Sequence, residues 1–325
     1  MKTGEDRLVR RIAHALEGKG RQRLVLGAGD DAALLKLRAG YQSILTCDWF
    51  LEGSHFLRDK HPPGSVGWKC LARAVSDVAA MGGQPLFFLL SLALPETHTG
   101  NWLDVFLRGL SRAARLFRCQ LAGGDTTRND KILINVTVIG DAPTGRAVLR
   151  SGARPGDLVY VSGRLGDAEL GLRLLRSGRA IGGRNRRWLK KHLYPEPRLA
   201  LGRWLAGKML ATAMMDLSDG LSTDLSRLCI ASGVGARIVI DRIPTVALPK
   251  KQSRNPLDVT ELALHAGDDY ELLFTIPPRQ VGRVPSAFHG LPLSCIGQVT
   301  REKQVVLVGP EGRAEKLAAR GWDPF

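Results

Sequence analysis

The amino-acid sequence predicts an α+β protein of two domains, each built on a mixed sheet. Three observations lead to this prediction. The chain has 325 residues, more than one hydrophobic core usually holds. Its 44% hydrophobic and 24% charged residues are ordinary for a globular protein. Helix-like and strand-like segments alternate in both halves, and a turn-rich stretch at 140–151 separates them, so we expect domains at 1–145 and 146–325.

The first half opens with helical periodicity over 4–17, where Leu8, Ile12 and Leu16 recur every four residues. Strand-like runs follow at 24–26, 33–37 and 43–46. An apolar stripe from Trp68 to Val78 predicts a helix that ends at the glycine pair 82–83. The remaining expected elements are a buried strand, a helix and a Val/Ile-rich strand, at 85–94, 102–117 and 131–140.

The second half continues the alternation. Strands are expected at 157–162, 213–216, 270–276 and 305–308. Helices are expected at 166–176, 197–209 and 219–232. A basic stretch, GGRNRRWLKKH, occupies 182–192 and has the composition of a solvated helix face.

Composition limits the classes of function. The net charge of +16 favours partners such as nucleic acid, anionic lipid or phosphorylated small molecules. The longest apolar run, 85–95, falls short of the roughly 20 residues of a membrane span, and no secretory signal is visible. Five dispersed cysteines without a C-x-x-C pair predict neither a disulfide framework nor structural zinc. We therefore expect a cytoplasmic protein without a membrane partner.

The placement of aspartates carries the chemical signal. They stand at predicted element ends or in glycine-rich turns, where backbone approaches a ligand closely: Asp30, Asp31, Asp48, Asp77, Asp125, Asp216 and Asp219. Each also has a structural interpretation, because Asp30, Asp31 and Asp125 suit turns and Asp219 suits a helix cap. Asp77 resists that interpretation, since a carboxylate near a helix C-terminus opposes the macrodipole.

Hydroxyls next to these carboxylates, at Thr46, Thr126 and Ser218, complete a set of oxygen donors. Magnesium prefers oxygen ligands and usually binds through few carboxylates plus substrate phosphates. Without cations, clustered carboxylates would repel each other and their pKa values would rise. The usual P-loop, dinucleotide and protein-kinase signatures are absent from the sequence. The residues alone therefore predict a magnesium–phosphate enzyme of unfamiliar type.

Seven motifs resemble those of a known family in order and spacing. They are GAGDDAALL (27–35), TCDWFLEGSHF (46–56), VSDVAAMGGQP (75–85), LAGGDTTR (121–128), RSGARPGDLVYVSGRLGDAELGL (150–172), MDLSDGLSTDL (215–225) and AGDDYELLF (266–274). The chain thereby resembles bacterial thiamine-monophosphate kinase, of the aminoimidazole-ribonucleotide synthetase superfamily. The resemblance implies that superfamily's fold and transfer of the γ-phosphoryl group of ATP to thiamine monophosphate, giving thiamine diphosphate and ADP. It also implies a homodimer that pairs through N-terminal domains, and an active site in a groove between the two domains.

The resemblance further implies roles for single residues. Magnesium ligands would be Asp31, Thr46, Cys47, Asp48, Asp77, Asp125, Asp216 and Asp219. ATP contacts would be Gly124, Asp125, Arg150 and Ser218. Contacts to thiamine monophosphate would be His55, Asp268 and Trp322. Because the acceptor is itself a phosphate, we expect direct in-line transfer with no covalent nucleophile on the protein.

Departures from the family pattern leave alternatives open. Cys47 replaces the usual middle threonine, and soft sulfur suits magnesium poorly, so its backbone carbonyl could serve instead. Asp268 replaces the usual glutamate, and residues 74–75 read Ala-Val instead of Asn-Leu. One alternative is a superfamily member with another acceptor. The other is a nucleic-acid-binding protein that uses 182–192, which is not expected because no recognised nucleic-acid motif accompanies that stretch.

Overall fold

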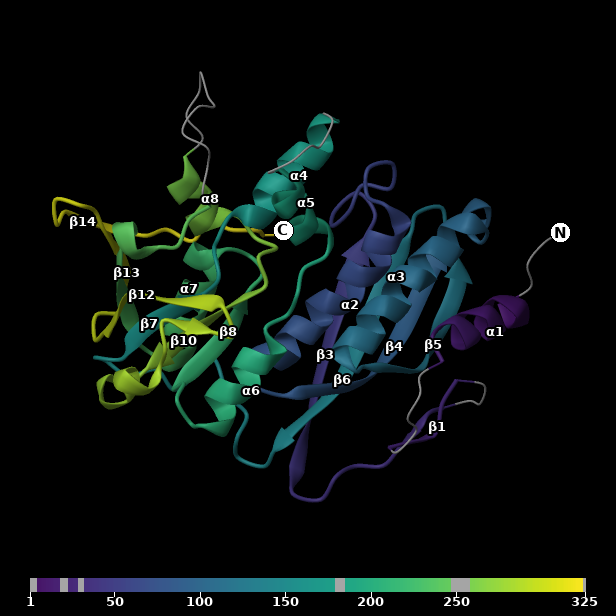
Figure 1. The fold of residues 1–325 in the computed structure, drawn as a ribbon, viewed down its shortest axis with the longest axis horizontal. Coiled ribbons are helices and arrows are strands. Elements are labelled where there is room, and N and C mark those ends of the chain that lie inside the picture. Colours follow the sequence, from purple (N-terminus) through teal and green to yellow (C-terminus); the bar gives the residue numbers. More distant parts are fainter. Residues whose placement is uncertain (1–4, 18–22, 29–31, 179–184, 247–257, 324–325) are drawn as a thin grey trace. The chain divides into compact units, whose positions relative to one another are not determined.

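The computed structural model describes residues 5–17, 23–28, 32–178, 185–246 and 258–323. The chain divides into two compact units, coloured by sequence in Figure 1. Unit 1 comprises Met1–Val78 and Gly83–Gly145, and unit 2 comprises Ala79–Gly82 and Arg146–Phe325. In the described residues, no helix is sufficiently long and apolar to span a membrane.

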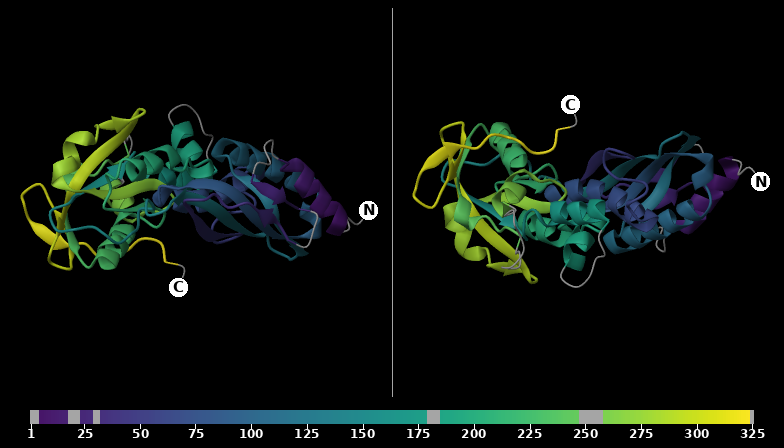
Figure 2. Two further views of the ribbon diagram at one scale, coloured as in Figure 1. Left: turned by 90° about the horizontal axis from the view of Figure 1, so that it is seen from below. Right: turned by 90° about the horizontal axis from the view of Figure 1, so that it is seen from above.

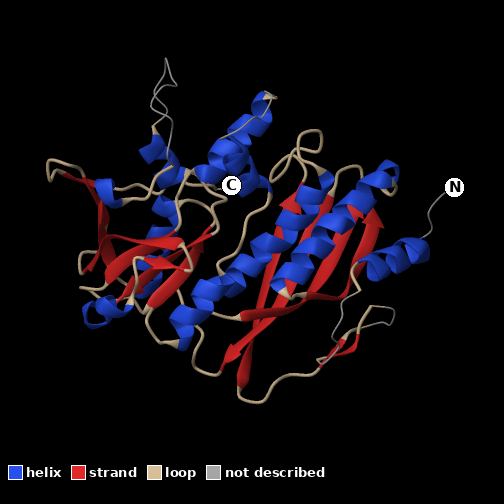
Figure 3. Cartoon of the chain, viewed as in Figure 1, coloured by secondary structure: helices blue, strands red, loops and turns tan. Residues whose placement is uncertain are grey.

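Unit 1 is built on a four-stranded mixed sheet of order β3-β6-β4-β5. Its strands are β3 (Tyr41–Leu51), β4 (Gln84–Leu94), β5 (Gln120–Arg128) and β6 (Leu133–Pro143). β6 pairs antiparallel with both β3 and β4, whereas β4 and β5 are parallel. Helices α2 (Pro63–Ala80) and α3 (Asn101–Phe117) cover one face of this sheet (Figures 1 and 3). The smaller elements are α1 (Glu5–Ala15), β1 (Leu24–Leu26), β2 (Leu34–Leu35) and η1 (Glu96–His98).

The two faces of β3 differ because successive side chains alternate across a strand. Ile44 and Phe50 are buried on the face that the helices cover, which we call the inner face. Leu45 and Trp49 are 69% and 54% exposed on the opposite, outer face. Because β3 is an edge strand, this apolar outer face adjoins a strand edge to which no other described strand is paired.

Unit 2 is built on a larger mixed sheet of order β14-β13-β9-β12-β7-β10-β8, with β11 paired to β12. Only β13 and β9 are parallel neighbours among the described strand pairs of this sheet. Its strands are β7 (Leu158–Ser162), β8 (Ala213–Leu217), β9 (Gly235–Val239), β10 (Glu271–Ile276), β11 (Ala287–Phe288), β12 (Leu291–Thr300), β13 (Val305–Val308) and β14 (Ala314–Lys316). Its helices are α4 (Asp167–Ser177), α5 (Arg186–Leu193), α6 (Leu199–Gly207), α7 (Leu221–Ser232), α8 (Val259–His265), η3 (Ile240–Arg242) and η4 (Pro278–Arg283).

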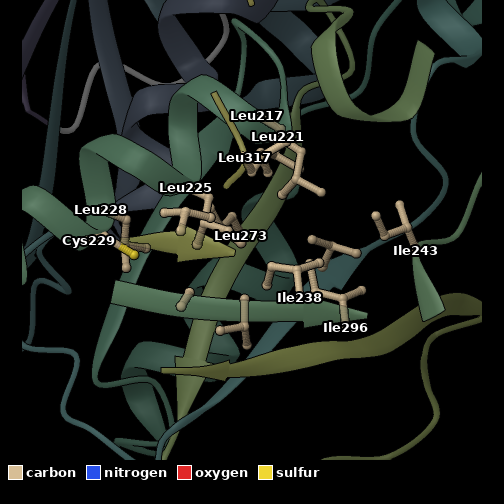
Figure 4. Packing of buried hydrophobic residues seen from close by; sticks show 14 of the residues in the cluster. Leu217, Leu221, Leu225, Leu228, Cys229, Ile238, Ile243, Leu273, Ile296 and Leu317 are labelled. Carbon is tan, nitrogen blue, oxygen red and sulfur yellow. The ribbon is translucent and has the colours of Figure 1, made fainter. Parts of the chain in front are cut away.

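The main core of unit 2 lies between α7 and the sheet. Leu221, Leu225 and Leu228 recur along α7 and point toward buried strand residues such as Leu273 and Ile296 (Figure 4). This apolar stripe explains why the sequence forms a helix here, since one face is buried along its length.

The two-domain α+β expectation with mixed sheets is confirmed, but several local predictions were wrong. The segment 120–128 forms strand β5, where we expected a turn around Asp125. The strand expected at 43–46 continues to Leu51, so Asp48 lies within a strand instead of at its end. β9 and β12 were not predicted. In each case pairing with neighbouring strands overrides a weak or glycine-interrupted local pattern.

Candidate functional site

The first group of candidate residues lies on the inner face of unit 1. Thr46 and Asp48 share that face by strand alternation, and α2 carries Asp77 toward it. The Thr46 hydroxyl donates a hydrogen bond to the Asp77 carboxylate. The structure thus brings Thr46 and Asp77 together although they are 31 positions apart.

Cys47 lies on the other face of the same strand. Its Sγ atom accepts a hydrogen bond from Asn135 Nδ2 at 3.1 Å, on the neighbouring strand β6. The thiol therefore points away from the Thr46–Asp77 pair, whereas the backbone of Cys47 runs between the two faces.

The glycine-rich motif of unit 1 forms part of β5. A Cβ atom on Gly124 would lie 1.9 Å from the carbonyl oxygen of Leu90, so this position requires glycine. Asp125 is exposed and pairs in register with Ser91, which pairs with Asn135. Asp125 therefore follows the outer face and is not brought together with Thr46 and Asp77.

Two further candidates of unit 1 stand apart from these. His55 Nδ1 accepts a hydrogen bond from the backbone N–H of Leu51 at 3.1 Å, which leaves the ring proton of the neutral imidazole on Nε2. The ring is half-buried beside Phe50, with 6.0 Å between centroids. Asp31 lies outside the described residues.

The second group of candidates surrounds the loop between β8 and α7 in unit 2. Asp216 is buried at the end of β8, and the Asp219 carboxylate pairs with Arg227. Asp224 accepts hydrogen bonds from the N–H groups of Asp219 and Gly220 at 3.0 and 3.1 Å. The N-cap of α7 is Gly220, so Asp219 is not a helix cap.

The electrostatics of this loop are dominated by Asp224. Burial, reinforced by the Asp219 carboxylate, raises the pKa of Asp224 to about 7. Arg227 Nη1 lies 3.1 Å from Asp224 Oδ1 and opposes that rise. Asp219 and Asp224 therefore share one guanidinium, which holds both carboxylates at the start of α7.

Two candidate substrate residues are attached to the same loop. The N–H of Asp268 donates to the carbonyl oxygen of Ser218 at 2.8 Å, and that of Trp322 donates to the carbonyl oxygen of Asp219 at 2.9 Å. Asp268 adopts a φ of +69°, unusual for a residue other than glycine, and its carboxylate accepts from the Tyr270 hydroxyl at 2.7 Å. The structure thus brings together Ser218, Asp219, Asp268 and Trp322.

Arg150 has an exposed side chain near the end of α7. Its carbonyl oxygen accepts a hydrogen bond from the Ser232 hydroxyl at 3.0 Å. This bond fixes the backbone of Arg150, whereas its side chain is exposed. Among the described residues, no hydrogen bond given for Arg150 joins it to the Ser218–Asp219 loop.

A buried ion cluster beside this site was missed by sequence reasoning. Glu271 is 1% exposed, and its carboxylate binds Lys191 Nζ at 2.5 Å, Arg198 Nε at 2.7 Å and the Ser162 hydroxyl at 2.6 Å. Burial would raise the pKa of Glu271, but Lys191 and Arg198 outweigh burial and lower it. The neighbouring Asp269 accepts from the N–H groups of Gly166 and Ala168 at 2.7 and 3.2 Å.

This cluster corrects the interpretation of the basic stretch. Lys191 is 17% exposed and paired inside unit 2, so the stretch is not wholly a solvated face. Lys190, its neighbour, is exposed and pairs with Glu196 at 3.4 Å. The available signal was that Glu271 falls within the apolar strand predicted at 270–276, because a carboxylate buried in such a strand requires cationic partners.

The donor set around both groups consists of carboxylate and hydroxyl oxygens. Such oxygens fit magnesium, which takes few protein ligands together with phosphate oxygens and water. No group of three or more His, Cys, Asp or Glu side chains in the described part of the chain is arranged to hold a metal. Within the described residues, each unit by itself thus offers fewer than three such side chains to one cation.

The chain has two units, each built on a mixed sheet and each carrying candidate aspartates, and two family models match it in the same order. The family model described as "AIR synthase related protein, N-terminal domain" matches residues 29–142, and its C-terminal counterpart matches residues 154–309. The chain therefore belongs to the AIR synthase-related family.

Full-length relatives narrow this class. Thiamine-monophosphate kinase of Escherichia coli (strain K12) is 36% identical over 330 residues, which cover 100% of this chain and 99% of the relative. The crystal structure of thiamine-monophosphate kinase from Stenotrophomonas maltophilia K279a matches with a TM-score of 0.83 and 36% identity over 97% of this chain and 99% of that one. A structure described as "AaThiL complexed with AMPPCP and TMP" matches with a TM-score of 0.78 and 34% identity over 99% and 97%. Within its class, the chain belongs with the thiamine-monophosphate kinases, as its motifs predicted.

Proposed function

We propose that this protein is an ATP-dependent thiamine-monophosphate kinase, which transfers the γ-phosphoryl group of ATP to thiamine monophosphate and releases thiamine diphosphate and ADP. The observation that carries the proposal is the Ser218–Asp219 loop. Its two carbonyl oxygens bind the backbones of Asp268 and Trp322, so residues assigned to nucleotide and metal share one support with residues assigned to thiamine monophosphate. The similarity to kinases of this name over the whole chain supports the same activity.

Magnesium is the cofactor that we propose. Thr46, Asp48 and Asp77 of unit 1 and Asp216 and Asp219 of unit 2 offer the oxygen donors that it prefers. When bound, magnesium would neutralise charge on the phosphates of both substrates. We assign Asp31 and the backbone of Cys47 to the same set on the resemblance alone, and on the same ground we assign Asp125, which lies on the outer face, to magnesium and ATP.

The protein's own part is to bind and orient two anions. At Gly124 the backbone of β4 approaches too closely for any side chain, so the contact that we assign to ATP at this position is made by the Gly124 backbone. Arg150 presents an exposed guanidinium for ATP, and Ser218 offers a hydroxyl and backbone next to Asp219. His55, with its proton on Nε2, is a donor for thiamine monophosphate. Direct in-line transfer requires no nucleophile from the protein, because the acceptor phosphate is already largely ionised near neutral pH.

We also propose a homodimer in the cytoplasm. The exposed outer face of β3, with Leu45 and Trp49 on an edge strand, has the character of a surface that a second copy covers. Sedimentation of the purified protein tests this. Trp49→Ser should shift the protein toward monomer, whereas a wild-type protein that stays monomeric as its concentration is raised contradicts the dimer.

The activity is tested by incubating purified protein with ATP, magnesium and thiamine monophosphate and measuring thiamine diphosphate by chromatography. We expect product from the wild type, and loss of product in Asp77→Asn and Asp125→Asn. ADP without thiamine diphosphate would keep the nucleotide site and contradict the acceptor. A folded protein that forms neither product would contradict the kinase altogether.

A further inference from the structure

The segment that carries Trp322 is held against the start of α7 by backbone hydrogen bonds. After β14 the chain continues as an extended segment, Leu317 to Trp322, which we call the C-terminal strap (yellow in Figure 2). Leu317 is buried in the core cluster near Leu217 and Leu221 (Figure 4). Beyond Leu317 the strap is mostly exposed, so hydrogen bonds instead of apolar burial must hold it in place.

The strap backbone is bound to the start of α7 at three consecutive residues. The N–H of Arg320 donates to the Ser222 hydroxyl at 3.3 Å, that of Gly321 to the Thr223 hydroxyl at 2.9 Å, and that of Trp322 to the Asp219 carbonyl at 2.9 Å. This approach is close, because a Cβ atom on Gly321 would lie 2.1 Å from the Asp219 carbonyl oxygen. Only glycine fits at position 321 without displacing the strap.

His265, at the end of α8, joins the strap to α7 from the side. Its Nδ1 lies 2.8 Å from Ser222 Oγ, and its Nε2 lies 2.8 Å from Arg320 Nη2. Arginine is always protonated and can only donate, so Nε2 is the acceptor and the ring proton is on Nδ1, from which it is donated to Ser222. The arrangement therefore requires a neutral imidazole.

Glu261 completes the arrangement from the same helix. Its carboxylate oxygens lie 3.1 and 3.3 Å from Arg320 Nη2. Burial, and next the Arg320 charge, lower the pKa of His265, which agrees with a neutral ring between Ser222 and Arg320. One guanidinium thus ties the strap to α8 through two side chains, and α8 in turn is tied to α7 through His265.

We propose that His265 and Arg320 are positioning residues for thiamine monophosphate, because they fasten the C-terminal strap and thereby hold Trp322 at the Ser218–Asp219 loop. The inference rests on the proposed function, which assigns Trp322 to the substrate. The Trp322 side chain is 46% exposed, so it is available to a ligand while its backbone is fixed. A contact residue on a segment that is already ordered binds its ligand without the entropy cost of ordering that segment.

The first test measures KM for each substrate separately. His265→Phe and Arg320→Met remove the side fastening and should raise KM for thiamine monophosphate about tenfold, as loss of a charged hydrogen bond would, with KM for ATP changed less than about twofold. Gly321→Ala should give the same selective increase without altering either fastening side chain. Arg320→Lys, which keeps a cation for Glu261, should recover part of the loss. Arg313→Met, at an exposed arginine of the same C-terminal region, is the matched control and should match the wild type.

A double-mutant cycle then asks whether His265 acts through Trp322. If it does, His265→Phe should cause no further rise in KM for thiamine monophosphate once Trp322→Ala is present. Additive effects would overturn the inference, as would an equal rise in both KM values. Hydrogen exchange provides a readout independent of turnover, since the amides of residues 320–322 should exchange faster in His265→Phe than in Arg313→Met, and equal rates would overturn the inference.

The kinetic outcomes separate this inference from the proposed function. A wild type that phosphorylates thiamine monophosphate, with variants that behave like it, overturns the strap's role alone. A wild type that forms no thiamine diphosphate overturns the proposed function, and the positioning role with it.

Discussion

The two units hold their candidate residues by different physical means. In unit 1, Thr46 lies on a regular strand and Asp77 on a long helix, and their positions follow from sheet register and helix packing. In unit 2, Ser218 and Asp219 lie on a short loop that other segments reach by backbone hydrogen bonds and by a guanidinium. The comparison teaches that the polar interactions around the candidate residues of unit 2 also maintain its structure, whereas Thr46 and Asp77 of unit 1 are positioned by a strand and a helix that pack through apolar side chains.

The largest expected effect tests whether unit 2 depends on its ion cluster. Glu271→Gln would leave Lys191 and Arg198 with a neutral partner in a buried position, so we expect a loss of about 3–5 kcal/mol in the free energy of unfolding. Urea denaturation followed by circular dichroism measures it. Glu311→Gln, at an exposed glutamate, is the control. A loss below about 1 kcal/mol, the value of a surface pair, would show that unit 2 does not rest on this carboxylate.

In unit 1 we expect a large effect on activity and a small effect on stability. Asp77→Asn should lower kcat/KM about 10²–10³-fold, a cost of the size that follows removal of one preorganised electrostatic group from an active site, while the free energy of unfolding changes by less than about 1 kcal/mol. Asp130→Asn, at an exposed aspartate of the same unit, should change neither. An unfolding change as large as that of Glu271→Gln would remove the contrast between the units.

Two adjacent lysines sharpen the comparison within unit 2. Lys191→Met leaves the buried Glu271 with one cation fewer and should cost about 2–3 kcal/mol of unfolding free energy, whereas Lys190→Met loses an exposed pair and should cost less than about 0.5 kcal/mol. Thermal or urea denaturation of the two variants side by side measures the difference. Equal costs would mean that Lys191 is in effect a surface residue.

The smallest effect concerns pH. Burial and Arg320 lower the pKa of His265 below its usual value of 6.5, with Glu261 acting in the opposite direction. Because the folded state then binds the proton less readily than the unfolded state, this histidine costs stability as the pH falls below about 6.5. The unfolding free energy of His265→Phe should therefore decline less than that of the wild type between pH 7 and pH 5. Parallel pH profiles would contradict a neutral, bonded His265.

Sequence patterns located the elements whose burial is periodic. The helix stripes at 68–78 and 219–232 and the apolar strand at 85–94 were predicted within a few residues, because one face or both faces of each element are buried along its length. The segment 120–128 gave no such signal, since its glycines suggest a turn. Its strand conformation is stabilised by parallel pairing with β4, which no local pattern contains.

The sequence likewise indicated some residues of the candidate site and not others. Residue types and motifs pointed to Asp77, Asp219 and Asp268, because a carboxylate that directly follows a serine or a glycine at the end of an element is well placed to bind a cation or a ligand. They could not reveal Lys191 as a partner of Glu271, since 80 residues separate the two and Lys191 stands among exposed basic residues. Nor could they indicate that Cys47 and Thr46 point to opposite faces, because the predicted strand ended at Thr46. In the structure the strand continues through both residues.

The orientation of Cys47 makes this thiol a chemical reporter. It is the exposed thiol among the five cysteines, whereas Cys70, Cys119 and Cys229 are buried and burial raises the pKa of each, so they resist alkylation. It lies on the outer face of β3 between Leu45 and Trp49, the surface that we assign to a second copy. The rate at which iodoacetamide labels Cys47 should therefore fall as protein concentration rises, which turns one side chain into a gauge of self-association.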